Sequence, residues 1–217
     1  GATVSFAESL EKLGENLREV RPTIFLGVPR VWEKIQGKMM EAGAQNSPLK
    51  KKIAAWARKV GLEAGYGLQK GEQPGFKYKI ADKLVFSKVR AKLGFDRCRF
   101  RVTAAAPISK ATLEFFMSLG LPIYEVYGMS ENTGPATVSN PAAWKTGYVG
   151  KVLEGTQMKI APDGEICMKG DHVFMGYLHN AEGTAEALDH EGWLHSGDVG
   201  EFDDQGFLRI TDRKKDL

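Results

Sequence analysis

The chain has little cysteine, no long apolar run and no basic-then-apolar leader. Its two cysteines, Cys98 and Cys167, lack metal-binding spacing and predict no disulfide framework. No run of about 18 apolar residues occurs, so we expect no membrane-spanning helix. The opening residues do not follow the pattern of a secretory signal. These absences favour a cytoplasmic protein, built as one large domain or two small ones.

Repeats and low-complexity tracts are also absent, but positive charge is strongly concentrated. Residues 50–101 contain 15 Lys/Arg and 4 Asp/Glu, a net charge of +11, whereas residues 102–217 contain 9 and 17, a net charge of −8. So dense a basic region could contact anionic lipid, the phosphates of a ligand or nucleic acid, or form a solvated helical face. No zinc-finger or RNA-binding signature accompanies the charge, so we expect no nucleic-acid partner.

The first part of the chain reads as alternating helices and short strands. Residues 5–8 resemble a capping box and precede apolar residues at helical spacing up to Val20. Pro29, Ser47-Pro48 and Ser109 are typical helix starts. The spacing predicts helices over 5–21, 30–42, 48–68, 76–93 and 110–119. It also predicts strands over 23–28, 99–104 and 121–126, the first and last of them buried.

The later part of the chain changes to short β-rich runs separated by turn residues. Strands are predicted over 149–153, 157–160, 165–169, 199–202 and 207–211, with a short helix over 180–188. The fold class expected is therefore α/β: part of a layered α/β domain, followed by a small, mainly antiparallel β-barrel-like subdomain. The boundary is predicted near residues 136–146.

A polar loop follows the predicted strand at 121–126. It carries one carboxylate, Glu131, between the hydroxyls of Ser130 and Thr133. Open α/β sheets bind ligands at the carboxyl ends of their strands, so this loop is a candidate site. By itself it reads equally well as a solvated strand-to-turn connection. Further downstream, residues 195–198 and 211–216 bring a second set of acidic and basic groups.

Together, residues 124–134, 195–198 and 211–216 resemble the motifs of adenylate-forming enzymes, which include acyl-CoA synthetases, peptide-synthetase adenylation domains and beetle luciferase. The stretches 21–23 and 28–34, with the loop at 127–134, are most similar to long-chain fatty acyl-CoA synthetases of the bubblegum-like branch. The resemblance covers essentially the whole chain.

The resemblance implies an ATP-dependent ligase that joins a fatty acid to CoA through an acyl-adenylate and releases AMP, with Mg²⁺ as the metal ion. Another carboxylic acid, whether aryl, short-chain or an amino acid, remains an alternative substrate. A non-catalytic module that binds nucleotide or a partner is a third possibility. The basic region at 50–101 could then meet CoA phosphates or serve as a peripheral membrane contact. The sequence does not indicate an oligomeric state.

The resemblance also implies roles for individual residues. Ser130 would contact the α-phosphate region, and Glu131 would bind the metal ion. The small turn of Ala104, Ala105 and Ala106 would lie against the adenine. Tyr127 would lie along the adenine, with Gly128 allowing close approach. Asp198 would bind the ribose hydroxyls, and Arg213 would lie near the ribose and phosphate. Each of these charges could instead form an ordinary surface ion pair.

The same resemblance indicates a piece of a longer enzyme. No Gly/Ser/Thr-rich phosphate loop followed by lysine occurs in the chain. Lys215 matches the hinge position before a C-terminal domain that is absent here. We therefore expect residues 1–140 to form the later part of the large AMP-binding domain and 141–213 the β-barrel-like subdomain. Residues 214–217 would start the hinge. The 217-residue chain by itself is predicted to be inactive.

Overall fold

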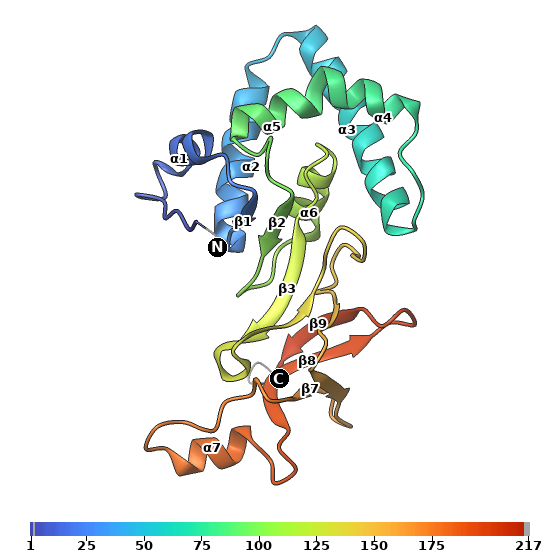
Figure 1. Cartoon of the computed structure of the whole chain (residues 1–217). Helices are drawn as coiled ribbons and strands as arrows, with labels where there is room; N and C mark the ends of the chain where they lie inside the picture. Colours follow the sequence, from blue (N-terminus) through green and yellow to red (C-terminus); the bar gives the residue numbers. More distant parts are fainter. Residues whose placement is uncertain (2, 215–217) are drawn as a thin grey trace. The chain divides into compact units, whose positions relative to one another are not determined.

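The computed structural model describes residues 1 and 3–214 (Figure 1). Its contacts divide the chain into two compact units, Gly1–Ile123 and Tyr124–Leu217. This division by contacts starts the second unit at the strand that precedes the Glu131 loop. The boundary near 140 concerns the domains of a complete enzyme and stays a prediction.

The first unit is mainly helical and contains one parallel pair of strands. Strands β1 (Ile24–Leu26) and β2 (Phe100–Thr103) pair in parallel, with Ile24 opposite Phe100. The helices are α1 (Leu13–Val20), α2 (Pro29–Ala44), α3 (Pro48–Gln69), α4 (Phe76–Ala81), α5 (Ser87–Leu93) and α6 (Lys110–Met117).

Three predicted helix starts are confirmed. Pro29 and Pro48 occupy the first turns of α2 and α3, where the missing N–H costs no hydrogen bond. The Ser109 hydroxyl accepts a hydrogen bond of 3.0 Å from the Thr112 N–H and so caps α6. Helical spacing and turn chemistry therefore placed these three helix starts correctly.

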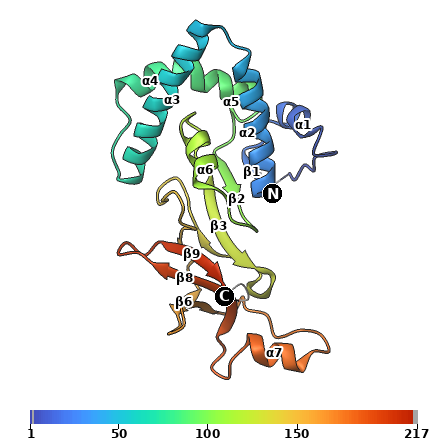
Figure 2. The same cartoon turned by 180° about the vertical axis from the view of Figure 1, so that it is seen from behind.

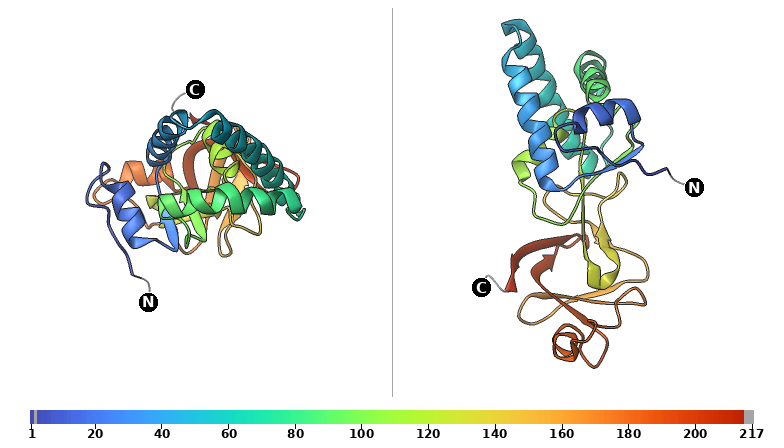
Figure 3. Two further views of the ribbon diagram at one scale, coloured as in Figure 1. Left: turned by 90° about the horizontal axis from the view of Figure 1, so that it is seen from above. Right: turned by 90° about the vertical axis from the view of Figure 1, so that its left-hand side faces the viewer.

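The predicted helix over 76–93 is present but contains an irregular segment. Between α4 and α5, residues Asp82–Phe86 form a π-helical turn, and Phe86 on this turn is fully buried. Gly94 ends the helix at φ 80°, a conformation that glycine adopts without strain. Helices α3 and α4 are packed as a helical hairpin, which can be followed from above in Figure 3.

The predicted helix start at residues 5–8 is wrong. Helix α1 begins at Leu13, and Phe6 is 90% exposed, so no burial stabilises a helix there. The Glu8 carboxylate instead accepts hydrogen bonds from the side chains of Lys12 and Asn16. These bonds link the segment before α1 to the helix without adding a helical turn.

The strand predicted over 23–28 forms as β1, but its predicted burial is wrong for the chain described here. Ile24 and Leu26 are each 63% exposed. The core of the first unit lies instead around Trp32, which is fully buried. Its indole N–H donates 2.9 Å to the Gly27 carbonyl, and its ring packs edge-on against Phe116. Trp32 is thus a packing residue.

The second unit is built from antiparallel strands and one short helix. Strands β3 (Tyr124–Met129), β4 (Gly134–Val138) and β5 (Lys151–Val152) pair in that order. A separate four-stranded sheet contains β6 (Gln157–Ile160), β7 (Glu165–Lys169), β8 (Leu194–Phe202) and β9 (Leu208–Arg213). Helix α7 (Ala181–Ala187) packs against β8.

The predicted antiparallel subdomain is confirmed. Strands β6 and β7 match the sequence ranges predicted for them, and Asn180 caps α7 through its side chain. The sheet of β6–β9 curls, as Figure 2 and the right-hand view in Figure 3 show. Strand β3 begins three residues later than predicted, at Tyr124 rather than at 121. Leu121 and Ile123 belong to the core of the first unit.

Candidate functional site

Glu131 lies in a tight turn directly after a strand, as the sequence predicts. Strand β3 ends at Met129, and Ser130–Asn132 forms one 3₁₀ turn before β4. The Asn132 side-chain oxygen accepts a 2.7 Å hydrogen bond from the Met129 N–H, and Asn132 is buried. Ser130 is exposed and Glu131 half-buried. The turn therefore fixes the backbone and presents both side chains toward solvent.

Gly128 allows a close approach, and the group that approaches it in the structure is the backbone of β4. A Cβ atom built at Gly128 would lie 1.8 Å from the Gly134 carbonyl oxygen on β4. The β3–β4 register shifts between Tyr127 and Gly128, where the strands come this close. The predicted contact of Gly128 with adenine stays a prediction, since the hairpin itself requires glycine here.

A loop after β7 holds the Glu131 turn from one side. The Tyr177 hydroxyl donates a 2.7 Å hydrogen bond to Glu131 Oε1, and the Phe174 N–H donates 2.7 Å to the Glu131 carbonyl. The Thr133 hydroxyl also donates 2.6 Å to the His172 carbonyl. Among the described residues, Glu131 Oε2 has no hydrogen-bond partner. One carboxylate oxygen is therefore positioned and the other is available to a ligand.

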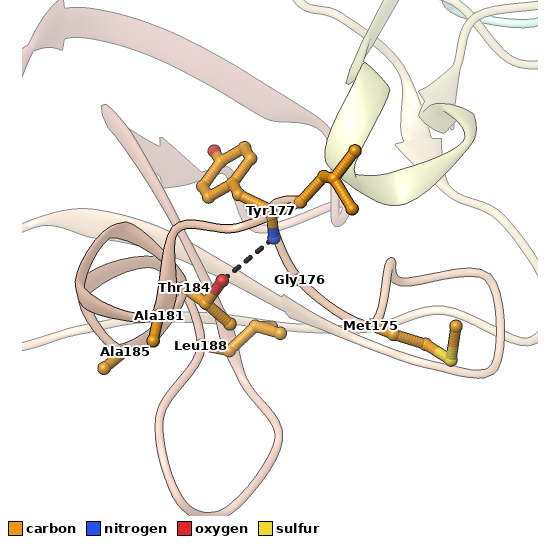
Figure 4. A pocket seen from close by; sticks show the side chains of 8 residues that line it. Met175, Gly176, Tyr177, Ala181, Thr184, Ala185 and Leu188 are labelled. Atoms are coloured by element: carbon orange, nitrogen blue, oxygen red, sulfur yellow. Dashed lines mark hydrogen bonds between the residues drawn. The ribbon is translucent and has the colours of Figure 1, made fainter.

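Tyr177 is itself held by Thr184 on α7. Its N–H donates a 2.9 Å hydrogen bond to the Thr184 hydroxyl, the dashed line in Figure 4. Next to it is a small pocket lined by apolar side chains, with Met175 fully exposed. The residues lining this pocket include Met175, Tyr177, Ala181, Thr184, Ala185 and Leu188. This hydrogen bond therefore fixes the backbone from which the Tyr177 ring projects.

Asp198, Arg213 and Tyr127 come together in the second unit. Asp198 on β8 and Arg213 on β9 are direct partners in the antiparallel register. Arg213 Nε donates 3.2 Å to Asp198 Oδ1, and the Tyr127 hydroxyl donates 2.9 Å to Asp198 Oδ2. Asp198 is 8% exposed, whereas the Arg213 side chain is 74% exposed. The carboxylate is thus fixed on both oxygens, and each oxygen keeps a lone pair for a ligand hydroxyl.

Tyr127 keeps its proton in this arrangement. Burial of the ring raises the pKa of its hydroxyl, and the charge of Asp198 raises it further. The phenol can therefore act as a hydrogen-bond donor to Asp198 throughout the physiological pH range.

A second buried carboxylate, Glu165, organises the strand that carries Asp198. Its oxygens accept 2.9 Å hydrogen bonds from the Gly197 N–H, from His195 Nδ1 and from Lys214 Nζ. Burial alone would raise the pKa of Glu165, but the bonds from His195, Lys214 and Gly197 outweigh it, so the pKa is lowered. Glu165 therefore stays ionised and ties His195 and Gly197, which precede Asp198 on β8, to β7.

Glu165, Cys167 and His195 have the chemistry of metal ligands, and their ligating atoms lie within 4.8 Å of one another. A metal ion would have to compete with Lys214, which already pairs with Glu165. Burial also raises the pKa of the Cys167 thiol to about 11, so the thiolate that metals need is disfavoured. We therefore interpret this group as structural.

The turn expected to face adenine lies in the first unit, directly after β2. Ala104 is half-buried, while Ala105 and Ala106 are exposed. Ala105 has a φ of 73°, in the left-handed region that favours glycine. The turn therefore holds one strained alanine. Its predicted role at the adenine stays a prediction.

Lys215 falls outside the described residues. The neighbouring Lys214 is described, and it pairs with Asp163 at 2.6 Å as well as with Glu165. The sequence reasoning missed Tyr177, Glu165 and Lys214. Only the Gly-Tyr at 176–177 gave a local signal, as an aromatic residue beside a turn. The pairing of Glu165 with Lys214 joins positions 49 residues apart and gives no local signal.

The family assignment follows from comparison with known proteins. A family model described as "AMP-binding enzyme" matches residues 1–178. The chain therefore belongs to the AMP-binding enzyme family, which confirms the resemblance to adenylate-forming enzymes.

Curated relatives place the chain more narrowly within this family. It is 56% identical over 94% of its length to a protein named long-chain-fatty-acid–CoA ligase ACSBG2 from Xenopus laevis. It is 42% identical over its whole length to the human protein of the same name. The chain spans only 29% and 34% of the lengths of these relatives. The bubblegum-like resemblance is thus confirmed.

Solved structures confirm the fold class. The chain superposes with a TM-score of 0.64 on o-succinylbenzoate CoA synthetase from Bacillus subtilis in complex with its acyl-adenylate intermediate. The match covers 96% of this chain and 34% of that one, at 20% identity. MatB from Rhodopseudomonas palustris, without ligand, gives a TM-score of 0.62 at 21% identity, covering 94% and 34% of the two chains. At these identities the likeness shows the fold alone.

No helix among residues 1 and 3–214 combines the length and the apolar character that a membrane crossing requires.

Proposed function

We propose that this chain is part of an ATP-dependent long-chain fatty acid–CoA ligase that acts through an acyl-adenylate. The observation that carries the proposal is Asp198, a buried carboxylate fixed by Arg213 and Tyr127 in a chain 56% identical to a long-chain ligase. The ligands are ATP, Mg²⁺, CoA and the fatty acid. ATP gives pyrophosphate when the acyl-adenylate forms, and AMP when CoA replaces it. Other carboxylic acids remain the alternative substrates.

Asp198 and Arg213 would hold the nucleotide. The two oxygens of Asp198 can accept hydrogen bonds from two neighbouring hydroxyl groups, the pattern that a ribose presents. The exposed Arg213 guanidinium offers further N–H donors for phosphate oxygens. We place Tyr127 behind Asp198 as a support for the carboxylate, in addition to its expected place along the adenine.

Glu131 would hold the magnesium ion. Its carboxylate suits a hard cation, and Oε2 has no partner among the described residues. When bound, Mg²⁺ supplies charge neutralisation for the phosphate oxygens. Ser130, exposed next to Glu131, can donate a hydrogen bond to the α-phosphate region. The chain's own contribution is therefore to position ligands and to compensate charge.

The decisive experiment uses the complete enzyme that contains this chain. Formation of CoA thioester and AMP is measured with ATP and a panel of carboxylic acids. We expect the highest kcat/KM with long-chain acids and a loss of at least about 100-fold in Glu131→Gln. Glu154→Gln, which changes an exposed acid in the same unit, serves as the matched control.

Two results would contradict the proposal. AMP release only with short, aryl or amino acids would replace the long-chain substrate, and no AMP with any acid would favour a non-catalytic module. An unchanged kcat/KM in the Glu131→Gln enzyme would contradict the metal role of Glu131. We further propose that the 217-residue chain alone makes no thioester, because no Gly/Ser/Thr-rich phosphate loop followed by lysine occurs in it.

We also propose that the basic region at 50–101 brings the enzyme to a membrane surface. Lys50, Lys51 and Lys52 are exposed at the start of α3. If they contact anionic lipid, binding of the complete enzyme to phosphatidylserine vesicles falls when all three are changed to glutamate. It also falls with rising salt concentration. Absence of binding at low salt would end this proposal.

A further inference from the structure

The first unit contains a groove between helices that none of the proposed adenylation residues lines. It has a volume of about 640 Å³, within the range of about 300–1,000 Å³ typical of small-molecule sites. Residues from α1, α2, α3, α5 and α6 line it, so it lies wholly within Gly1–Ile123. These helices can be followed in Figure 1 and Figure 3.

The interior of the groove is apolar. Several of its side chains belong to or pack against the main core of this unit, yet they also face the open space. These include Leu13, Ile35, Met39, Val89, Phe115 and Leu119. Small residues on α3, Ala54 and Ala55, leave room on the opposite wall. Such a surface takes up a flexible hydrocarbon chain by the hydrophobic effect, without requiring hydrogen bonds.

The groove is bordered by positive charge and lacks acidic side chains. Six cationic residues line it, and no Asp or Glu does: Arg18, Lys34, Lys38, Lys51, Arg58 and Lys92. Lys34 pairs with Glu11, and Arg58 donates to the Ser118 hydroxyl. The other four have no ion-pair partner among the described residues. An apolar interior with unpaired cations around it is complementary to an amphiphile with a negative head.

We propose that this groove binds the anion of a long-chain fatty acid, with the hydrocarbon chain among the helices and the carboxylate against the rim cations. A molecule with one anionic head group and one hydrocarbon chain matches the cationic border and the apolar interior of the groove. The site adds to the proposed function, because it would give the complete enzyme a second place for an acyl anion.

The test measures binding to the 217-residue chain, using cis-parinaric acid as a fluorescent probe and unlabelled palmitate as competitor. We expect saturable binding of one probe per chain. Methyl palmitate, which lacks the charge, should compete at least about tenfold more weakly than palmitate, as should octanoate, which loses apolar contact. Palmitoyl-CoA serves to distinguish the free acid from its thioester, and we expect the free acid to compete better.

Two pairs of charge reversals separate the groove from general electrostatic attraction. Lys38→Glu with Lys92→Glu changes two groove cations, and we expect affinity for palmitate to fall about tenfold or more. Lys77→Glu with Lys79→Glu makes the same change in net charge on exposed α4 positions that do not line the groove. This control should alter affinity less than about twofold. Equal losses in both pairs would overturn the proposal.

A third variant tests the apolar interior without changing charge. Ala54→Phe places a ring on the α3 wall of the groove and should weaken binding at least about tenfold. Circular dichroism checks that the variant keeps its fold. Ala91→Phe, on the exposed surface of α5 and outside the groove, is the control. Unchanged affinity in a folded Ala54→Phe chain would contradict the site.

A measurement of binding stoichiometry then tests whether the groove is open in the complete enzyme. We expect two palmitate molecules per enzyme, of which the Lys38→Glu/Lys92→Glu pair removes one while thioester formation continues. A stoichiometry of one that this pair does not alter would mean that another part of the enzyme covers the groove, and would overturn the proposal. Thioester formation is measured separately, so failure of the groove leaves the proposed function standing.

Discussion

The Tyr177 hydroxyl donates a 2.7 Å hydrogen bond to Glu131 Oε1, although 46 residues separate the two in sequence. The bond fixes one carboxylate oxygen and leaves the other toward solvent. Groups that orient a metal ligand in this way commonly change metal affinity about 10- to 100-fold when they are removed. The pair therefore gives a direct test of the metal role proposed for Glu131.

The first prediction is that Tyr177→Phe raises the Mg²⁺ concentration needed for half-maximal activity of the complete enzyme about tenfold. The ring is kept, so packing should change little. The measurement is thioester formation against Mg²⁺ concentration at saturating ATP. Tyr66→Phe is the matched control, since the Tyr66 hydroxyl also donates to a glutamate, Glu114, in the first unit. Equal Mg²⁺ requirements in the two variants would contradict the positioning role.

The second prediction concerns the buried carboxylate Asp198. Tyr127→Phe removes the 2.9 Å hydrogen bond to Oδ2 and leaves a buried charge with one donor fewer. We expect the free energy of unfolding of the chain to fall by about 1–2 kcal/mol in urea denaturation. The KM for ATP of the complete enzyme should also rise. Tyr148→Phe, whose hydroxyl has no partner among the described residues, should have little effect on either quantity.

The third prediction is a pH dependence that arises from Glu125. Burial raises the pKa of this carboxyl to about 7, although it accepts a hydrogen bond from the Gly147 N–H. Because the folded pKa exceeds the unfolded one, the folded state binds the proton more tightly. Stability contributed by this group is therefore full below about pH 4.5 and is lost as pH rises to about 7.

Glu125→Gln should remove this pH dependence. The amide keeps an oxygen for the Gly147 N–H but carries no charge. At pH 8 we expect the variant to be more stable than the parent chain by about 1–2 kcal/mol, a value reduced from the full pKa shift because the side chain is only half-buried. At pH 4.5 the gain should be much smaller. A gain of the same size at both pH values, measured by urea denaturation, would disprove the assignment to ionisation.

The fourth prediction addresses the strained turn after β2. Ala105 has a φ of 73°, where an L-residue costs about 1 kcal/mol or more relative to glycine. We expect Ala105→Gly to raise the free energy of unfolding by about 0.5–1 kcal/mol. Ala106→Gly should lower it, because the φ of Ala106 is not positive and glycine there only adds freedom to the unfolded chain. Thermal unfolding of the two variants, compared directly, checks the signs.

Local patterns predicted much of this fold because local interactions decide it. The starts of α2, α3 and α6 follow from Pro29, Pro48 and Ser109, whose effects act within one helical turn. The segment at 5–8 had the same kind of signal, but no core covers Phe6. Where burial and capping disagree, burial decides, and a sequence pattern alone does not show what covers a residue.

The residues of the candidate site also fall into those that local motifs predict and those that they do not. Glu131, Asp198 and Arg213 could be named from their motifs, and the register of β8 and β9 brings the last two together. Tyr127 was also named, but for the adenine and not for its hydrogen bond to Asp198. Other groups that hold the site could not be named. Tyr177 and Lys214 act across distances of 46 and 49 residues, through hydrogen bonds that depend on the finished fold.

The pairing of Asp198 with Arg213 across β8 and β9 has a genetic consequence. Side chains of a strand alternate between faces, so adding or deleting one codon in the 203–206 turn would carry Arg213 to the opposite face. The protein would keep both charged residues but lose the ion pair between them. The length of this turn should therefore be inherited as strictly as the two charges themselves, even though the side chains of Asp204 and Gln205 in it are exposed.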